Sequence, residues 1–119
     1  MPAVRTLYLH TVGHKSGTPR RTPLYFVDDG DDVAVITSNA GRDRQPAWWL
    51  NLQADPNAEV EIGKQRRPVR ARAATRAEFE RLWPKFVAGL RNYEAYRRRT
   101  DRELVIVMLA PRPPAGAGL

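Results

Sequence analysis

Short apolar runs separated by turns rich in glycine, proline and aspartate dominate the first part of the chain. Residues 6–12 predict a strand that begins almost at the first residue, and residues 22–27 predict a second strand. Residues 33–37 are apolar enough to predict a third strand that is buried on both faces. Within residues 28–32, an Asp-Gly pair indicates a tight hairpin between the second and third strands.

A helix and a second hairpin are predicted in the middle of the chain. Pro46 suits the first helical position, where no N–H partner is needed, and the helix is expected to run to about Ala54. Residues 58–62 and 68–74 alternate with a period of two and are expected to pair around residues 63–65. Opposite charges would then face each other across this hairpin, at Glu59, Glu61, Arg70 and Arg72.

An amphipathic helix and a last strand complete the pattern. Thr75 and Glu78 have the spacing of a capping box, which predicts the start of a helix. Pro84 is expected to kink or divide this helix, and residues 104–109 predict a closing strand. The buried face of the helix is expected at Phe79, Leu82, Trp83, Phe86, Val87 and Leu90.

The order of these elements predicts an α+β fold. Short hairpins argue against a doubly wound parallel sheet, and about six mostly antiparallel strands with helices packed outside them indicate a small barrel. Residues 1–110 are expected to form a single domain, and residues 111–119 a flexible C-terminal tail.

Composition limits the possible chemistry. The 119 residues contain no cysteine, which excludes disulfides, thiolate metal sites and a cysteine nucleophile. No apolar stretch has the length of a signal peptide or a membrane span, so a cytoplasmic protein is expected, with a loose contact to the inner membrane surface as an open alternative. The net charge of +7 favours anionic partners. His10 and His14 have no partner acid or thiolate pattern, so no metal site is expected.

Two segments carry most of the candidate chemistry. Residues 13–25, GHKSGTPRRTPLY, are a basic turn between two strand-like runs and supply backbone donors and cationic side chains. Residues 38–52 contain a turn of small residues and then a helix that opens with two tryptophans. Together the segments suit a ligand with an anionic tail and a planar ring. Adjacent tryptophans cannot share a helix face, so one is expected in the core and the other in the ligand groove.

Several motifs in order then resemble the deazaflavin-dependent nitroreductase family: G-x-K-S-G-x-P-R, T-P-L-Y, S-N-x-G, P-A-W and N-L-x-A-D-P. The similarity covers residues 7–109 and ends with Tyr93, Tyr96 and a Thr-Asp-Arg triplet at residues 100–102. It implies a split β-barrel that binds coenzyme F420, a 5-deazaflavin with a phospholactyl-oligoglutamate tail. It also implies hydride transfer from the reduced cofactor to a small-molecule acceptor, namely a quinone, a nitroaromatic or an activated enone.

The resemblance also implies which residues form the site. The phosphate and tail would lie on the basic turn and the ring on the second segment, with phenols as an aromatic wall and a proton donor for the acceptor. The implied catalytic residues are Tyr25, Ser38, Tyr93 and Tyr96. The implied cofactor-binding residues are His14, Lys15, Ser16, Arg20, Arg21, Thr22, Pro23, Leu24, Tyr25, Ile36, Thr37, Ser38, Asn39, Ala47, Trp48, Trp49, Leu50 and Asn51. Asp101 and Arg102 are expected to form a local ion pair.

The sequence differs from the family pattern in two places, and it leaves several alternative functions open. The chain almost wholly lacks the N-terminal segment with which members usually begin, and Ala40 stands where a second glycine is common. An FMN-binding split barrel or a non-catalytic cofactor carrier would show much the same motifs. A barrel that binds nucleic acid is the weakest alternative, because the basic stretch of residues 66–72 contains no aromatic residue. A homodimer is possible for such a barrel.

Overall fold

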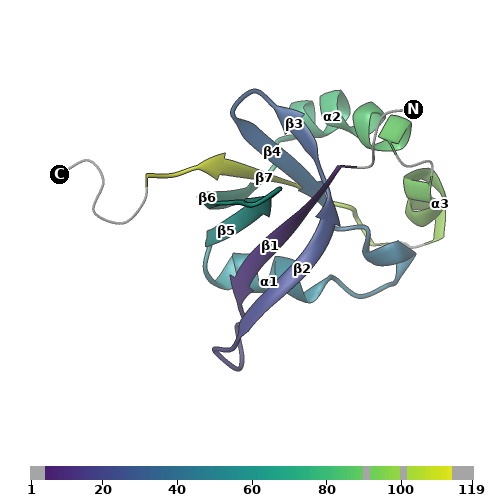
Figure 1. The fold of residues 1–119 in the computed structure, drawn as a ribbon. Coiled ribbons are helices and arrows are strands. Elements are labelled where there is room, and N and C mark those ends of the chain that lie inside the picture. The colour runs from purple at the N-terminus through teal and green to yellow at the C-terminus, as the bar shows by residue number, and fades with distance from the viewer. Residues whose placement is uncertain (1–4, 90–91, 100–101, 114–119) are drawn as a thin grey trace.

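The computed structural model describes residues 5–89, 92–99 and 102–113, and its centre is a curled antiparallel sheet (Figure 1). Seven strands form this sheet in the order β2-β1-β5-β6-β7-β4-β3. Their bounds are β1 Thr6–Val12, β2 Pro19–Tyr25, β3 Val27–Asp29, β4 Asp32–Ile36, β5 Asn57–Ile62, β6 Gln65–Ala73 and β7 Ile106–Pro111. The α+β class predicted from the pattern is confirmed.

The two edge strands, β2 and β3, are consecutive in the chain and meet at Phe26. The Phe26 N–H donates to the carbonyl of Arg5, the residue before β1, at 3.0 Å. The chain therefore passes from one edge strand of the sheet to the other at Phe26. The sheet therefore curls round on itself. The predicted strand at residues 22–27 is in fact two strands, and it begins earlier, at Pro19, which accounts for seven strands where about six were expected.

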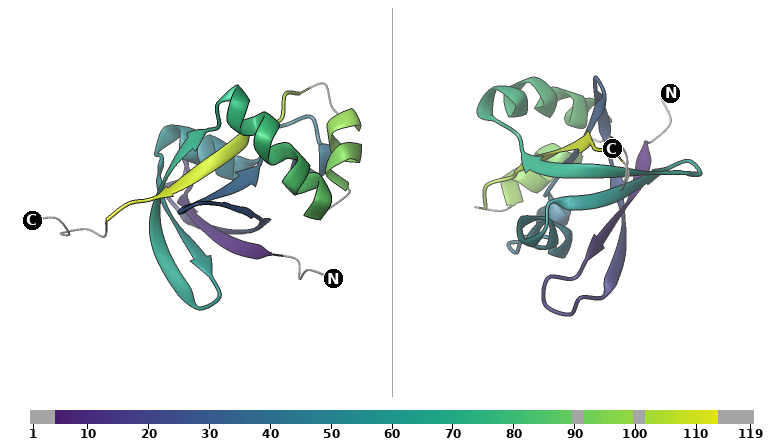
Figure 2. Two further views of the ribbon diagram at one scale, coloured as in Figure 1. Left: turned by 90° about the horizontal axis from the view of Figure 1, so that it is seen from above. Right: turned by 90° about the vertical axis from the view of Figure 1, so that its left-hand side faces the viewer.

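The helices cover both sides of the sheet (Figures 1 and 2). Helices α2 (Arg76–Gly89) and α3 (Asn92–Arg99) pack with the alternate residues of β4 and β7 that include Ala34 and Ile106. Helix α1 (Ala47–Ala54) instead joins the inner cluster that includes Val35 and Val107. The expectation that helices pack outside the strands thus describes α2 and α3, whereas α1 completes the inner core. A 3₁₀ turn, η1 (Asn39–Gly41), precedes α1.

Tight turns set the register of the two predicted hairpins. Gly30 and Gly63 have positive φ values of 62° and 63°, which glycine adopts without strain. The β5–β6 turn is shorter than predicted, because Ile62 pairs directly with Gln65. The predicted charge pairing is therefore wrong for Arg70 and Arg72. Arg70 lies opposite Asn57, and Arg72 lies beyond the last residue that pairs with β5. Across this hairpin the basic partner of Glu59 is Arg66, at 2.5 Å.

Other element boundaries move by a few residues. Pro46 is the N-cap of α1 and keeps an extended conformation, so the helix begins at Ala47. Helix α2 continues through Pro84 to Gly89, so the prediction that this proline divides the helix is wrong. The last strand extends to Pro111, and Arg112 donates to the carbonyls of Val69 and Ala58, so the start of the expected tail is bound to the sheet. Leu90 and residues 114–119 lie outside the described residues.

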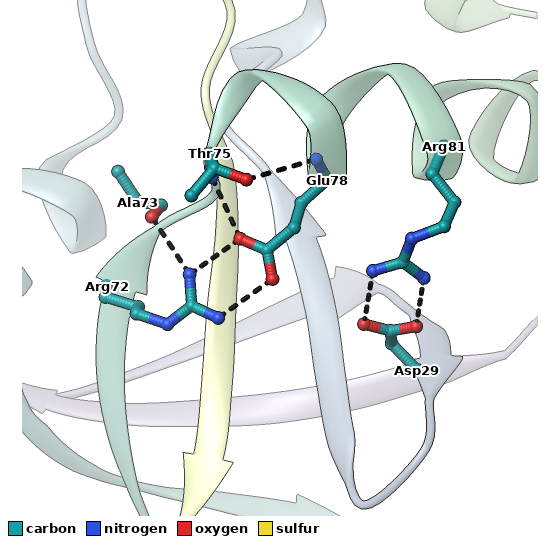
Figure 3. Close-up of polar contacts among 6 residues, drawn as sticks. All are labelled: Asp29, Arg72, Ala73, Thr75, Glu78 and Arg81. Carbon is teal, nitrogen blue, oxygen red and sulfur yellow. Dashed lines mark hydrogen bonds and ion pairs between the residues drawn. The ribbon is translucent and has the colours of Figure 1, made fainter.

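The capping box predicted at the start of α2 is confirmed and carries an additional ion pair (Figure 3). The Glu78 N–H donates to Thr75 Oγ1 at 3.2 Å, and the Thr75 N–H donates to Glu78 Oε1 at 2.9 Å. Arg72 of β6 donates to both carboxylate oxygens of Glu78, at 2.7 and 2.9 Å. One turn further on, Arg81 binds Asp29 of β3. These contacts fasten α2 to the sheet on which the site depends.

The capping carboxylate predicts an acid-sensitive part of the stability. Hydrogen bonds from Arg72 and Thr75 lower the pKa of Glu78 from 4.5 to about 2. Because the folded pKa lies below the unfolded one, this contribution is present above pH 4.5 and is lost as the pH falls towards about 2. We expect Glu78→Gln to flatten the pH dependence of the unfolding free energy in that window, measured by urea unfolding. Glu80→Gln, which changes an exposed carboxylate, is the control and should keep the wild-type slope.

Candidate functional site

The β1–β2 turn is a compact loop with donors and cations on its surface. The Gly13 N–H donates to the Thr18 carbonyl, and the Gly17 N–H donates to the Gly13 carbonyl, both at 2.8 Å. Of the two glycines, only Gly17 has a positive φ, of 70°. At Gly13 the constraint is a close approach, because a Cβ there would lie 2.6 Å from Ser16 Oγ and would force Ser16 to shift. Lys15 and Arg20 are exposed on this turn.

Asn51 attaches the turn to helix α1. Its Oδ1 accepts hydrogen bonds from the backbone N–H of His14 at 2.9 Å and from His14 Nδ1 at 2.7 Å. Its Nδ2 donates to Thr11 Oγ1 at 3.1 Å, and only 4% of the residue is exposed. Since Oδ1 can only accept, His14 carries its proton on Nδ1. Asn51 therefore fixes the position of the turn, and the two hydrogen bonds that its Oδ1 accepts both come from His14.

Two neighbouring cavities lie between this turn, the strand β2 and helix α1. The first, which we name the basic cavity, has a volume of about 300 Å³ and is lined by three strongly basic side chains. The complete lining is Gly13, His14, Lys15, Ser16, Arg20, Arg21, Thr22, Ala47, Trp48 and Asn51. Backbone donors and cations of this kind bind phosphate and carboxylate groups.

The second cavity, which we name the aromatic cavity, has a volume of about 650 Å³. Thr22, Ala47 and Trp48 line both cavities, so the two form one groove. We call the basic cavity its cationic end and the other, where Tyr25 and Tyr93 lie together with Arg42 and Arg44, its aromatic end. The complete lining of the aromatic cavity is Thr22, Pro23, Leu24, Tyr25, Ile36, Ser38, Asn39, Arg42, Arg44, Gln45, Pro46, Ala47, Trp48, Leu50 and Tyr93.

Both tryptophans belong to the inner core, so the expected division between core and groove does not describe them fully. Trp48 also lines both cavities, whereas Trp49 lines neither of them. The structure thus identifies Trp48 as the tryptophan at the groove. Its place at the junction of the two cavities is the feature that joins the cationic and aromatic ends.

Three phenols meet at the far end of the aromatic cavity. The Tyr93 ring lies 6.0 Å from that of Tyr25 and 6.0 Å from that of Tyr96, and Tyr96 packs on it edge to face without lining the cavity. Tyr93 is only 6% exposed. Burial, together with the neighbouring Tyr25 and Tyr96, raises the pKa of Tyr93 well above its usual value near 10. Tyr93 is therefore a neutral hydroxyl at physiological pH and can donate a hydrogen bond.

Helix α2 fixes Tyr25 through a very close approach. A Cβ added at Gly89 would lie 1.7 Å from the Tyr25 hydroxyl and 2.4 Å from its ring carbon Cζ. Any side chain at position 89 must therefore displace the Tyr25 ring. Gly89 could not be found from the sequence, because a glycine at the end of a helix is ordinary in itself.

We accordingly expect Gly89→Ala to lower the free energy of unfolding by about 1–3 kcal/mol, the usual cost of overpacking. Urea unfolding measures this change. In a Tyr25→Ala background the ring is absent, so the same substitution should cost much less. Equal costs in the two backgrounds would show that the contact between Gly89 and Tyr25 is not the cause.

The structure brings most of the implied site residues to the groove, with three exceptions. Thr37, Trp49 and Tyr96 line neither cavity. The Thr37 hydroxyl accepts a hydrogen bond from the Val105 N–H at 2.9 Å, and the residue is fully buried. Five residues of the lining were not among the implied site residues: Gly13, Arg42, Arg44, Gln45 and Pro46. Gly13 and Pro46 belong to motifs that were recognised, whereas Arg42, Arg44 and Gln45 fall between the S-N-x-G and P-A-W motifs.

Ser38 stands at the start of the η1 turn and lines the aromatic cavity. Its carbonyl accepts hydrogen bonds from the Gly41 N–H at 2.8 Å and from Arg102 at 3.1 Å. Its hydroxyl makes no capping bond to the turn. Asn39 and Gly41, on either side of Ala40, both have positive φ, of 45° and 79°. The hydrogen bonds to the Ser38 carbonyl thus hold the backbone of this turn.

Several charged groups away from the groove form ion pairs with one another. In the basic stretch of residues 66–72, Arg66 pairs with Glu59 and Arg72 with Glu78. His10 Nε2 lies 3.1 Å from Glu61. Within the described ranges, no group of three or more potential ligands is placed to hold a metal ion. None of the helices in those ranges has the length and apolar composition needed to cross a bilayer.

Comparison with known proteins points in the same direction as the groove. The family model described as F420H(2)-dependent quinone reductase matches residues 1–111. The F420H(2)-dependent quinone reductase Rv1261c of Mycobacterium tuberculosis (strain ATCC 25618 / H37Rv) is 36% identical over 110 residues, which are 90% of this chain and 74% of that protein.

Solved structures agree with this result. The structure described as an F420-H2 dependent reductase (FDR-A) has a TM-score of 0.79 and 28% identity, and the match covers 92% of this chain and 99% of the other. A second structure, described as a domain-swapped dimer, has a TM-score of 0.80 and 29% identity, with 88% and 79% covered. These similarities confirm the split-barrel fold that the motifs implied.

Proposed function

The chain belongs to the F420H(2)-dependent quinone reductase family, and from this premise we propose that it reduces quinones with coenzyme F420 bound in the groove. One observation carries the placement. Trp48 lines both cavities, so the cationic end opens directly onto the aromatic end. This order matches a cofactor whose planar ring is joined to an anionic tail, and the two volumes fall within the usual range for ligand sites.

The basic cavity would hold the phosphate and the carboxylates of the tail. Lys15, Arg20 and Arg21 supply cations, and the glycine-flanked turn supplies backbone donors. Arg21 also lies over the Tyr8 ring at 3.6 Å, which restrains its guanidinium. Asn51, which also lines this cavity, would hold the turn against α1.

The aromatic cavity would hold the ring and the acceptor. When bound, the reduced deazaflavin supplies a hydride, so the protein itself needs no metal or nucleophile for this step. Trp48 and Tyr25 provide flat surfaces that orient planar molecules. Ser38 and Tyr93 both line this cavity, so their hydroxyls would hydrogen-bond an acceptor oxygen, and the neutral Tyr93 would donate the proton that a reduced quinone requires.

The acceptors that the protein reduces in addition to quinones are a separate proposal. The family name specifies quinones. We propose that nitroaromatics and activated enones also react, because an aromatic wall recognises flatness and not one particular functional group.

The first test is a titration of the protein with oxidised coenzyme F420, followed by quenching of the cofactor's fluorescence, with FMN in a parallel series. Micromolar or tighter binding of F420 alone supports the proposal, and binding of FMN alone would assign the groove to a flavin instead. Reduced F420 with a water-soluble quinone then tests turnover through the return of cofactor fluorescence. Binding without turnover would indicate a cofactor carrier.

A further inference from the structure

The wall of the aromatic cavity is formed partly by a loop, residues 37–45, which contributes Ser38, Arg42 and Gln45 to the lining. A loop that shapes a site must be held by contacts outside the site. Here those contacts come from the segment that joins α3 to β7. The Thr37 N–H donates to the Val105 carbonyl at 3.0 Å, and the Val105 N–H donates to Thr37 Oγ1 at 2.9 Å.

Arg102, on the same segment, makes most of the remaining contacts. Its Nη1 donates to the Thr37 carbonyl at 2.7 Å and to Gln45 Oε1 at 3.0 Å. Its Nη2 donates to the Ser38 carbonyl at 3.1 Å and to the Arg42 carbonyl at 3.0 Å. One guanidinium group thus joins the beginning, middle and end of the loop. Its side chain does not line the aromatic cavity.

We propose that Arg102 is the positioning residue that holds residues 37–45 in the shape of the cavity wall and so places the Ser38 hydroxyl for the acceptor. The consequence for turnover rests on the proposed function, whereas the consequence for the loop does not. The ion pair expected between Asp101 and Arg102 stays a prediction, because Asp101 lies outside the described residues.

Arginine is the side chain suited to this task. Its planar guanidinium presents five N–H donors in fixed directions, whereas a lysine ammonium is a point charge with three donors. A lysine at position 102 keeps the charge but cannot reach four separated acceptors at once. Arg102→Lys therefore keeps the positive charge at position 102 but removes the simultaneous hydrogen bonds to the four acceptors.

Arg112 offers a matched control at the far end of β7. It also donates from a guanidinium to backbone carbonyls, to Val69 at 3.0 Å and to Ala58 at 3.3 Å, and it lines neither cavity. Arg112→Lys should therefore reproduce the general loss of arginine–carbonyl hydrogen bonds without touching the loop.

The deciding measurement is hydrogen–deuterium exchange of the cofactor-free protein. In Arg102→Lys, amides of residues 37–45 should exchange about tenfold faster, since removing the hydrogen bonds that hold the loop promotes local opening. In this variant the exchange rate of peptides from the β1–β2 turn should be unchanged. In Arg112→Lys the exchange rate of residues 37–45 should equal that of the wild type. Unchanged exchange of the loop in Arg102→Lys, or equal acceleration in Arg112→Lys, would overturn the proposal.

Kinetics give a second readout. With F420 affinity within about threefold of wild type, kcat for quinone reduction should fall about tenfold in Arg102→Lys, because misplacement affects the reacting end only. A wild-type protein that binds no F420 would refute the proposed function but would leave the exchange result decisive for Arg102. If Arg102→Lys does not fold, Gln45→Ala removes one acceptor alone and should still accelerate exchange of the loop, and unchanged exchange there would count against the proposal.

Discussion

Charge reversal at Lys15 is expected to weaken binding of coenzyme F420 about 100-fold, because it replaces a charge-assisted contact with repulsion of the anionic tail. Lys15 is exposed on the β1–β2 turn and lines the basic cavity, so Lys15→Glu should fold normally. Fluorescence titration measures the dissociation constant. Once cofactor is saturating, kcat should stay close to wild type, since Lys15 lies at the tail end of the groove.

The matched control is Lys64→Glu, at the exposed turn of β5 and β6. It makes the same change in net charge but lines neither cavity. If both variants lose the same affinity, the effect would belong to the overall field of a basic protein and not to a tail site. Added salt should weaken the wild type more steeply than Lys15→Glu, because screening acts on the contact that the variant has already lost.

Local sequence chemistry predicted the parts of this fold that depend on neighbours in the chain. The Asp-Gly hairpin, the Thr75–Glu78 capping box and the buried strand at residues 33–37 all follow from short-range rules. The predicted register of β5 and β6 was wrong, and Pro84 was expected to kink or divide α2 but does not divide it. The register follows from a two-residue turn that the composition around Gly63 does not specify.

The candidate site likewise contains residues that the sequence indicated and residues that it did not. Motif resemblance indicated Lys15, Tyr25 and Trp48, and all three line the groove. The close approach of Gly89 to Tyr25 and the four contacts of Arg102 could not be predicted, because each joins segments more than 50 residues apart. Gly89 and Arg102 line neither cavity, so only their contacts in the folded structure show that they support the site.

The phenol at position 93 provides the sharpest test of the reacting end. Tyr96 was expected to affect turnover or acceptor choice, but in the structure Tyr93 lines the aromatic cavity and Tyr96 packs behind it. We expect Tyr93→Phe to lower kcat for quinone reduction about 100-fold, the usual effect of losing a proton donor, with little change in F420 affinity. Tyr96→Phe keeps the packing and should have a much smaller effect.

The pH profile separates a proton donor from a simple packing contact. Because burial raises the pKa of Tyr93 above its usual value of 10, its hydroxyl stays protonated through the neutral and mildly alkaline range. The wild-type kcat should therefore show no fall due to this group up to about pH 9. In Tyr93→Phe the proton must come from water, so the solvent deuterium isotope effect on kcat should change. A larger loss of kcat in Tyr96→Phe than in Tyr93→Phe would reverse the assignment and make Tyr96 the donor.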